Sequence, residues 1–329
     1  MENTVNSRLQ SVRFGEVQSY KNIAIVPLVS PEEGKFLYLT LGEALTGWNI
    51  AVTEVSTGGS VPELMVVNRG NKPVLLIDGE ELSGAKQNRV LNTSILLKEA
   101  SSTKIPVSCT EQGRWSYTSQ AFKESGNIMT RGTRARKARS VSASLAESAS
   151  FHSDQGEVWD GIAELQAKAC APSPTSAMSD IFKAREDDLR QCEQIFKPAP
   201  NQVGLLAVID GKAAGLDLVS LTAAYVKLHS KLVRSYALEG LLQSKARPTT
   251  RKAALDRTKA FLDEILVAEA TPFPSVGYGT DLRFEAKGLA GTALVHDNEA
   301  IHAAFFRLDE QDKPGKMAPL SNRRRRFTE

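Results

Sequence analysis

The sequence predicts an α+β fold, and three features of the chain lead to that prediction. The first 115 residues consist mainly of runs of strand length, and from about residue 153 the spacing of apolar residues changes to a helical period. Strand-like runs then return at residues 289–296 and 300–308. Separate blocks of strands and helices favour α+β over alternating β-α-β units. We therefore expect a mainly antiparallel β N-terminal half, a helical middle and a C-terminal β-hairpin that returns to the sheet, because a lone hairpin is marginal in water.

Residues 1–121 are expected to form the β-rich part. Apolar runs of strand length recur there and are separated by turn residues such as Gly, Asn and Pro. A short helix is expected between the first two runs, because Leu41, Ala44, Leu45 and Trp48 fall at helical spacing. The predicted strands are residues 22–29, 50–55, 61–68, 73–78, 90–97 and 104–111.

The remaining parts follow from changes in composition. Residues 122–152 lose the apolar pattern and are rich in Gly, Ser, Ala and basic residues, which predicts a flexible crossing. Residues 153–270 form the helical part, which opens on a capping-box pattern at Asp154 and includes one buried strand, VGLLAVI. The C-terminal hairpin takes residues 271–310, and residues 311–329 form a basic tail that is expected to be disordered.

Composition indicates a cytoplasmic protein without a membrane partner. The chain has 329 residues, of which 41% are hydrophobic and 24% are charged, as is usual for globular domains. No apolar run approaches the ~20 residues of a membrane span, and the first residues lack the pattern of a signal peptide. The three cysteines lie far apart in sequence, so they predict reduced thiols.

Two basic segments are candidate phosphate contacts. The segment RGTRARKAR, from Arg131 to Arg139, holds five basic residues, and the tail ends in four consecutive arginines from Arg323 to Arg326. Such segments bind nucleic acids in many proteins, but they are also found as solvated surface. Nucleic acid is therefore a possible partner on the sequence alone.

A polar cleft is predicted between residues 78 and 115, where chemically active side chains gather at the ends of strands. Glu80, Glu81, Glu111 and Cys109 are the candidate catalytic residues, as acids, bases or a nucleophile. No histidine lies near Cys109 in sequence, so a buried, unreactive thiol is the alternative. Asp78 and Glu80 are candidate ligands for Mg²⁺, because carboxylate oxygens suit that ion.

The candidate ligand-binding residues come from the same cleft and combine cations, amides and an indole. An arginine fork suits carboxylate or phosphate, and an indole suits the face of a base or sugar. The mixture therefore suits an anionic, hydroxyl-bearing ligand. In the alternative, Trp115 fills the core and Arg114 pairs with Glu111 or Glu81. The candidates are Lys86, Gln87, Asn88, Arg89, Arg114 and Trp115.

The chain resembles a known family at four runs of residues. These are LLIDGEELSGAKQNR, IPVSCTEQGRW, QVGLLAVIDGKAAGLDLVS and LVRSYALEG. They are similar to the bacterial ARPP-type domain, which is named for its association with ADP-ribosylglycohydrolases and rhodanese-type phosphatases. The resemblance covers roughly residues 21–308. It implies a link to enzymes that process ADP-ribose or other NAD-derived compounds, and it brings no established activity or catalytic residues.

Three functional hypotheses follow. The first is an enzyme, a hydrolase or transferase, or a ligand-binding protein that acts on an ADP-ribose or NAD-derived compound in the cleft. The second is a nucleic-acid-associated accessory protein that uses the arginine-rich segments. The third is an interaction scaffold whose polar cleft is structural.

Overall fold

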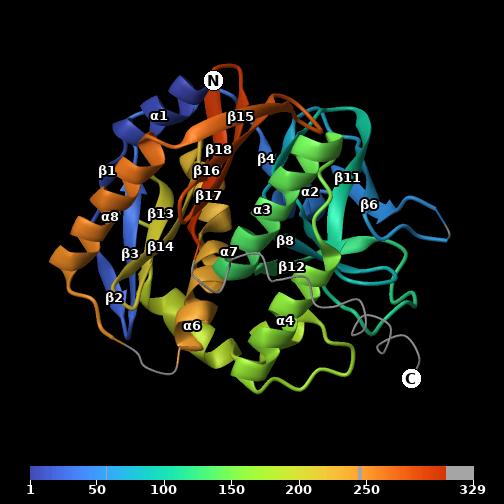
Figure 1. Cartoon of the computed structure of the whole chain (residues 1–329). Helices are drawn as coiled ribbons and strands as arrows, with labels where there is room; N and C mark the ends of the chain where they lie inside the picture. Colours follow the sequence, from blue (N-terminus) through green and yellow to red (C-terminus); the bar gives the residue numbers. More distant parts are fainter. Residues whose placement is uncertain (57, 244–246, 309–329) are drawn as a thin grey trace.

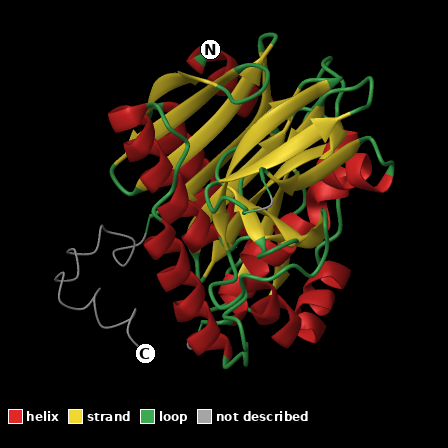
Figure 2. Ribbon diagram, turned by 90° about the vertical axis from the view of Figure 1, so that its right-hand side faces the viewer, coloured by secondary structure: helices red, strands yellow, loops and turns green. Residues whose placement is uncertain are grey.

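The computed structural model describes residues 1–56, 58–243 and 247–308 (Figure 1). Its helices and largely antiparallel strands confirm the α+β class. Figure 2 shows that helices flank the strands on more than one side. No helix in the described part of the chain is long and apolar enough to cross a bilayer.

The largest sheet unites strands from the two ends of the chain. Its order is β1-β3-β13-β14-β18-β17-β16-β15, with β2 paired to β3, and every pairing is antiparallel. The C-terminal strands therefore return to the sheet, as predicted. The strands are β1 (Arg13–Phe14), β2 (Gln18–Tyr20), β3 (Ile23–Val29), β13 (Gln202–Ile209), β14 (Lys212–Val219), β15 (Glu269–Pro274), β16 (Thr280–Ala286), β17 (Leu289–His296) and β18 (Glu299–Arg307).

Both faces of this sheet are buried, because side chains of alternate residues in a strand point to opposite faces. In β3, Ile23 and Ile25 join the core that contains the helix α7 (Thr222–Leu241). Ala24 and Val26 join a second core with Phe261 of α8 (Arg251–Leu266) and residues of α1 (Glu2–Ser11). The continuous apolar runs of β3 and β13 are thus explained by helices on both faces.

The middle of the N-terminal half forms two further sheets. The larger has the order β12-β8-β9-β11-β6-β5 and the smaller β10-β7-β4, in which β4 and β7 are parallel. The helix α2 (Leu41–Thr46) follows β4 and starts with a Thr40 capping box. The strands are β4 (Leu39–Thr40), β5 (Ile50–Glu54), β6 (Glu63–Asn68), β7 (Val74–Leu76), β8 (Glu80–Gly84), β9 (Arg89–Leu91), β10 (Ile95–Leu97), β11 (Ser101–Cys109) and β12 (Phe122–Ile128).

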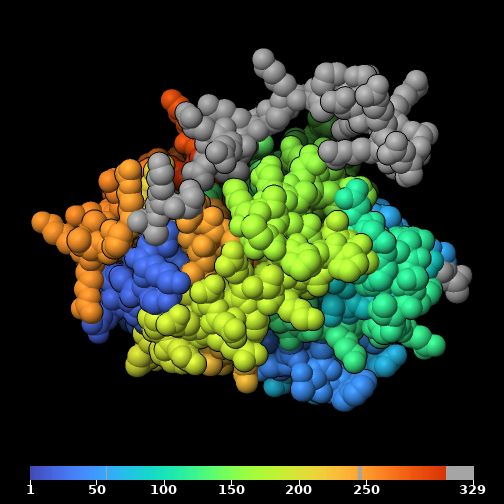
Figure 3. Space-filling view, turned by 90° about the horizontal axis from the view of Figure 1, so that it is seen from below, coloured from blue at the N-terminus to red at the C-terminus, as the bar shows by residue number. Residues whose placement is uncertain are grey.

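The helical middle precedes β13 in sequence. It occupies the centre of the lower face of the molecule (Figure 3). It contains α4 (Gln155–Ala169), α5 (Met178–Ala184) and α6 (Glu186–Ile195). The carboxylate of Asp154 caps α4 by accepting from the backbone of Gly156 and Glu157, as the sequence pattern indicates. The long helix α7 then packs between the large sheet and β12, which joins the two β bodies (Figure 1).

Several predicted segments differ in the structure. Residues 122–152, expected as a flexible crossing, form β12 and the helix α3 (Arg131–Ser148). The helical middle, 153–270, holds two strands of the large sheet, β13 and β14, because the apolar run continues after the turn at Asp210 and Gly211. The C-terminal hairpin, β17 and β18, is the second half of an antiparallel run of strands from β15 to β18. The N-terminal helix α1 was not predicted. The tail from residue 311 lies outside the described residues.

The helix α3 lacks the usual helical spacing of apolar residues, because its buried face carries basic side chains. Arg134 and Lys137 are fully buried there, together with alanines. Their partners come from elsewhere in the chain: Lys137 pairs with Asp78, and Arg134 lies between Asp78 and Asp217. Buried charges are tolerated when they are paired, so a basic stretch can form a core helix only if the fold supplies these acids.

Asp217 of β14 is the centre of this network. Its two oxygens accept hydrogen bonds from Arg134 at 3.0 and 2.8 Å, and one also accepts from the Tyr236 hydroxyl at 2.7 Å. Burial alone would raise the pKa of Asp217, but Arg134 and His302 outweigh that effect and hold the pKa at about 2. Arg134 Nε also donates to Asp78 at 3.3 Å, so the network joins the large sheet to the loop after β7.

We expect Arg134→Met to lower the free energy of unfolding by about 3–5 kcal/mol, because it leaves two buried carboxylates without their shared partner. The matched control is Arg190→Met, which removes a solvent-exposed pair with Glu186 and should cost less than about 1 kcal/mol. Chemical denaturation of both variants measures the difference. Equal losses would contradict the central role of Arg134.

Candidate functional site

Strand register divides the predicted cleft residues between two faces of one sheet. Arg89 of β9 lies opposite Leu82 of β8 and Cys109 of β11, whereas Glu81 lies opposite Val90. Directly opposite residues in antiparallel strands share a face, and neighbours along a strand do not. Arg89 and Cys109 therefore face one side, and Glu81 faces the other.

Arg89 is the most unusual of the predicted ligand-binding residues. Its side chain is completely buried. Nη1 donates to the Gln87 amide oxygen at 3.0 Å and to the Asn88 carbonyl at 3.3 Å. Nε and Nη2 have no hydrogen-bond partner among the described residues. Unpaired donors on a buried cation cost free energy, so an anionic acceptor at this position would be strongly favoured.

The exposed aromatic ring of Trp115 covers this cation, and a second ring lies beside the neighbouring Lys86. The Trp115 ring centroid lies 5.7 Å from Cζ of Arg89 and 5.1 Å from Nζ of Lys86. Lys86 Nζ also lies 5.2 Å from the Tyr117 ring and donates to the Gly58 carbonyl at 2.6 Å. Trp115 and Tyr117 are each about half exposed, at 48% and 50%. The site thus combines two cations with aromatic faces that a ligand from solvent can reach.

Arg114 holds the loops of this site together. Its Nη1 donates to the Ala85 carbonyl at 2.7 Å and to the Ser116 carbonyl at 2.9 Å. Its Nη2 donates to the Asn88 amide oxygen at 3.2 Å and to Glu111 at 2.6 Å. Of the alternative, the pairing of Arg114 with Glu111 is present, whereas Trp115 is about half exposed and does not fill the core. Arg114 positions the loops, and ligand binding by its guanidinium stays a prediction.

Glu111 is the counter-ion of this arrangement. Besides Arg114, its carboxylate accepts from Thr175 at 2.9 Å and from the Asn88 backbone at 3.2 Å. Burial alone would raise the pKa of Glu111, but these hydrogen bonds outweigh it and hold the pKa below its ordinary value. The group is therefore ionised near neutral pH, which suits a structural anion or a base rather than an acid.

Cys109 has the surroundings of a buried thiol. It is inaccessible to solvent, and its Sγ accepts from the Glu111 backbone at 3.4 Å. Burial raises the pKa of the Cys109 thiol, although Arg89 nearby acts in the opposite direction. A thiol that stays protonated is a weak nucleophile, which favours the structural interpretation.

Asp78 and Glu80, the predicted magnesium ligands, lie in the core and pair with cations. Asp78 binds Arg134 and Lys137, and Glu80 binds Lys231. Glu80 also accepts from the Ile77 backbone at 2.8 Å. In the described part of the chain, no group of three or more His, Cys, Asp or Glu side chains has the arrangement of a metal site. The geometry favours counter-ions, and the magnesium site stays a prediction.

Three of the five cations in the basic segment from Arg131 to Arg139 form ion pairs with acidic residues of the protein and are buried. Arg131 pairs with Glu239, and Arg134 and Lys137 belong to the buried network. These three side chains are buried, whereas Arg136 and Arg139 are half-buried. Binding of a nucleic acid through this segment stays a prediction. Arg323 to Arg326 lie outside the described residues, so binding through them stays a prediction.

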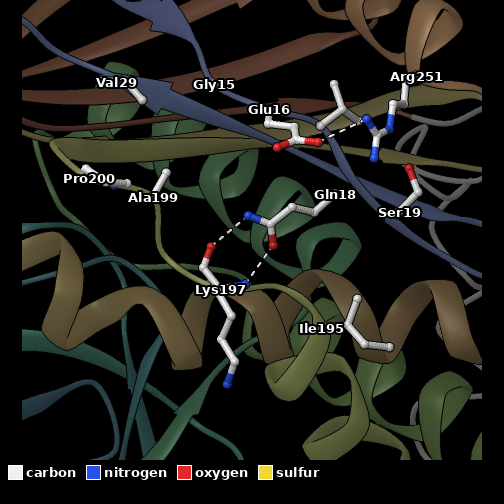
Figure 4. Close-up of a pocket in the computed structure, with 11 residues that line it drawn as sticks. Gly15, Glu16, Gln18, Ser19, Val29, Ile195, Lys197, Ala199, Pro200 and Arg251 are labelled. Carbon is white, nitrogen blue, oxygen red and sulfur yellow. Dashed lines mark hydrogen bonds and ion pairs between the residues drawn. The ribbon is translucent and has the colours of Figure 1, made fainter.

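A hollow of about 650 Å³ lies between the β1–β2 segment and the loop after α6 (Figure 4). Its polar groups bond mainly to one another. The Gln18 side chain makes two hydrogen bonds of 2.7 Å with the Lys197 backbone, and Glu16 pairs with Arg251 at 3.0 Å. No motif in the sequence points to this region. We place the candidate site at Arg89 instead, because there buried donors remain unpaired beside exposed aromatic rings.

Fold and site together define an α+β protein with a buried cation beneath an aromatic surface. The family follows from the sequence as a whole: residues 11–306 match the model of ARPP-1, the ARG and Rhodanese-Phosphatase-superfamily-associated Protein domain. The chain belongs to this family, which confirms the resemblance. No curated protein and no solved structure matches the chain.

Glu81 should make stability depend on pH. Burial raises its pKa from 4.5 to about 7, although Thr110 Oγ1 donates to it at 2.9 Å. The folded state then binds a proton that the unfolded state has released, so rising pH between these values lowers stability by about 3 kcal/mol. Glu81→Gln removes this loss. Denaturation at about pH 4 and pH 8 should show the variant gaining on the native protein by that amount at the higher pH. A constant difference would contradict the buried, proton-binding carboxyl.

Proposed function

We propose that the protein binds a phosphate-bearing small molecule of the ADP-ribose or NAD-derived class at Arg89, Lys86 and Trp115. The observation that carries the proposal is Arg89, a fully buried guanidinium whose Nε and Nη2 have no partner among the described residues. Natural proteins rarely keep such a group unless it serves a purpose. A ligand that supplies acceptors would explain it.

The chemistry of the three side chains suits different parts of one ligand. The unpaired Nε and Nη2 groups of Arg89 form the edge of the guanidinium that binds phosphate or carboxylate through two parallel hydrogen bonds. Lys86 adds a second positive charge beside the Trp115 ring. The half-exposed ring of Trp115 is a surface on which a base or a sugar can stack.

Membership of the ARPP-1 family supports the same class of ligand. The family is named for its association with two superfamilies, the ADP-ribosylglycohydrolases, abbreviated ARG, and the rhodanese-type phosphatases. Enzymes of the first kind handle ADP-ribose, and those of the second remove phosphate. A partner protein that binds an ADP-ribose-like compound would act beside both.

Binding is better supported than catalysis. Glu81, whose pKa of about 7 would suit an acid or base, faces the opposite side of the β8–β9 pair from Arg89. Glu111 is held as the partner of Arg114, and Cys109 is buried. Hydrolase or transferase activity on NAD-derived compounds therefore remains a second step to be tested once a ligand is found.

We expect Arg89→Met to reduce affinity for ADP-ribose by about 100-fold or more, because it removes two charge-assisted hydrogen bonds that contribute roughly 1.5–3 kcal/mol each. The variant should unfold at the same temperature as the native protein or higher, since it removes an incompletely paired buried charge. Isothermal titration calorimetry and thermal unfolding measure the two effects. Unchanged ADP-ribose affinity, or no binding by the native protein, would refute the site.

Arg114→Met is the matched comparison at the same loops. It removes hydrogen bonds to three backbone carbonyls and to Glu111, so we expect a lower unfolding temperature. Trp115→Ala should weaken binding of ADP-ribose by about 1–3 kcal/mol per stacked base and leave inorganic phosphate unaffected. If Trp115→Ala weakened both ligands equally, the ring would cover Arg89 without stacking on the ligand.

A further inference from the structure

Glu54 borders the candidate site and has an unused acceptor. It is the last residue of β5, and only 9% of it is exposed. Its Oε1 accepts from the Lys86 backbone at 3.4 Å, and its Oε2 has no hydrogen-bond partner among the described residues. A buried carboxylate oxygen without a partner is as costly as the unpaired donors of Arg89.

The geometry around Gly59 places Glu54 beside the aromatic surface. A Cβ atom built on Gly59 would lie 3.5 Å from Glu54 Oε2, 3.4 Å from Cζ2 of Trp115 and 3.2 Å from Cδ of Lys86. These three side chains therefore border one point. Gly59 has φ of +77°, so glycine both permits the turn and leaves this point open.

Glu54 is also close enough to Arg89 to affect the pKa of its guanidinium. Burial lowers the pKa of Arg89, and the nearby Cys109 and Glu54 act against that effect. Yet Glu54 Oε2 and the free N–H groups of Arg89 do not bond to each other. An unpaired acceptor and unpaired donors thus lie near the same aromatic ring.

From this arrangement we infer that Glu54 is a specificity-determining residue that accepts a hydrogen bond from a sugar hydroxyl of the ligand while Arg89 binds its phosphate. The inference rests on the proposed function and narrows it to sugar phosphates. An ionised carboxylate only accepts hydrogen bonds and repels a bare phosphate. A ligand that carries a hydroxyl beside its phosphate satisfies both groups, and buried polar groups left unpaired by the wrong ligand provide strong discrimination.

The test compares Glu54→Gln with the native protein by titration with ribose 5-phosphate, ADP-ribose and inorganic phosphate. We expect affinity for ribose 5-phosphate to fall about tenfold, because a charged acceptor becomes a neutral one. Affinity for inorganic phosphate should stay the same or rise, because a nearby negative charge is removed. The affinity for ribose 5-phosphate should therefore fall while the affinity for inorganic phosphate does not. This difference separates hydroxyl recognition from a loss of structure, which would weaken binding of both ligands.

The variants and controls keep the two proposals distinguishable. Glu63→Gln on the neighbouring strand β6 removes an exposed carboxylate and should change neither ligand. Glu54→Asp keeps the charge but withdraws the oxygen, so it should weaken ribose 5-phosphate without improving phosphate. Comparison with ADP-ribose shows whether Glu54 recognises the sugar hydroxyl of a simple sugar phosphate only or also that of a nucleoside diphosphate sugar.

Equal effects of Glu54→Gln on ribose 5-phosphate and inorganic phosphate, in either direction, would overturn the role of Glu54 and leave the Arg89 site intact. Failure of the native protein to bind any of the three ligands would refute the proposed function itself. A tenfold or larger loss confined to the two sugar-bearing ligands would support both.

Discussion

The ion network of Asp78, Arg134 and Asp217 is the constraint on which the rest of the structure depends. It joins a loop of the central sheets, the helix α3 and the large sheet, three parts that are far apart in sequence. Buried ions cost solvation energy, so the network adds less to net stability than its Coulomb attraction suggests. Its main effect is on geometry, because only one arrangement of these elements pairs every charge. Tyr236 and His302 extend that requirement to α7 and β18.

Arg89 and Arg134, the two arginines that are completely buried among the described residues, illustrate different uses of the same side chain. Arg134 bonds through Nε, Nη1 and Nη2 to two carboxylates, and its position is fully accounted for by the fold. Arg89 is equally buried but has only neutral partners at Nη1. That contrast supports a structural role for Arg134 and the proposed anion-binding role for Arg89. It also locates the candidate site at the start of β9, where the loops held by Arg114 lie beside exposed aromatic rings.

The sequence pattern identified many residues of the candidate site, but it did not indicate their roles. Residues 86–89 and 111–115 do lie together, because β9 and β11 pair directly and place their ends side by side. The sequence could not separate Arg114 from Arg89, since both are arginines in turn-rich segments. Hydrogen bonds to Glu111 and to several backbone carbonyls make Arg114 a positioning residue. Two N–H groups without a partner among the described residues make Arg89 a candidate ligand contact. Glu54 was missed because its link to the site runs through the turn at Gly59, which lies 27 residues before Lys86 and 56 residues before Trp115 in the sequence.

Local pattern determined the α+β class, the strand-rich N-terminal half, the caps of α2 and α4, and the return of the C-terminal strands to the sheet. These features depend on side-chain period and on bonds between near neighbours, which a sequence records directly. Tertiary structure alone decided that the basic segment after Thr130 is a core helix, because the acids that neutralise it are 56 and 83 residues away in sequence. It likewise decided which face of β8 and β9 each cleft residue occupies, since strand register depends on pairing between distant residues.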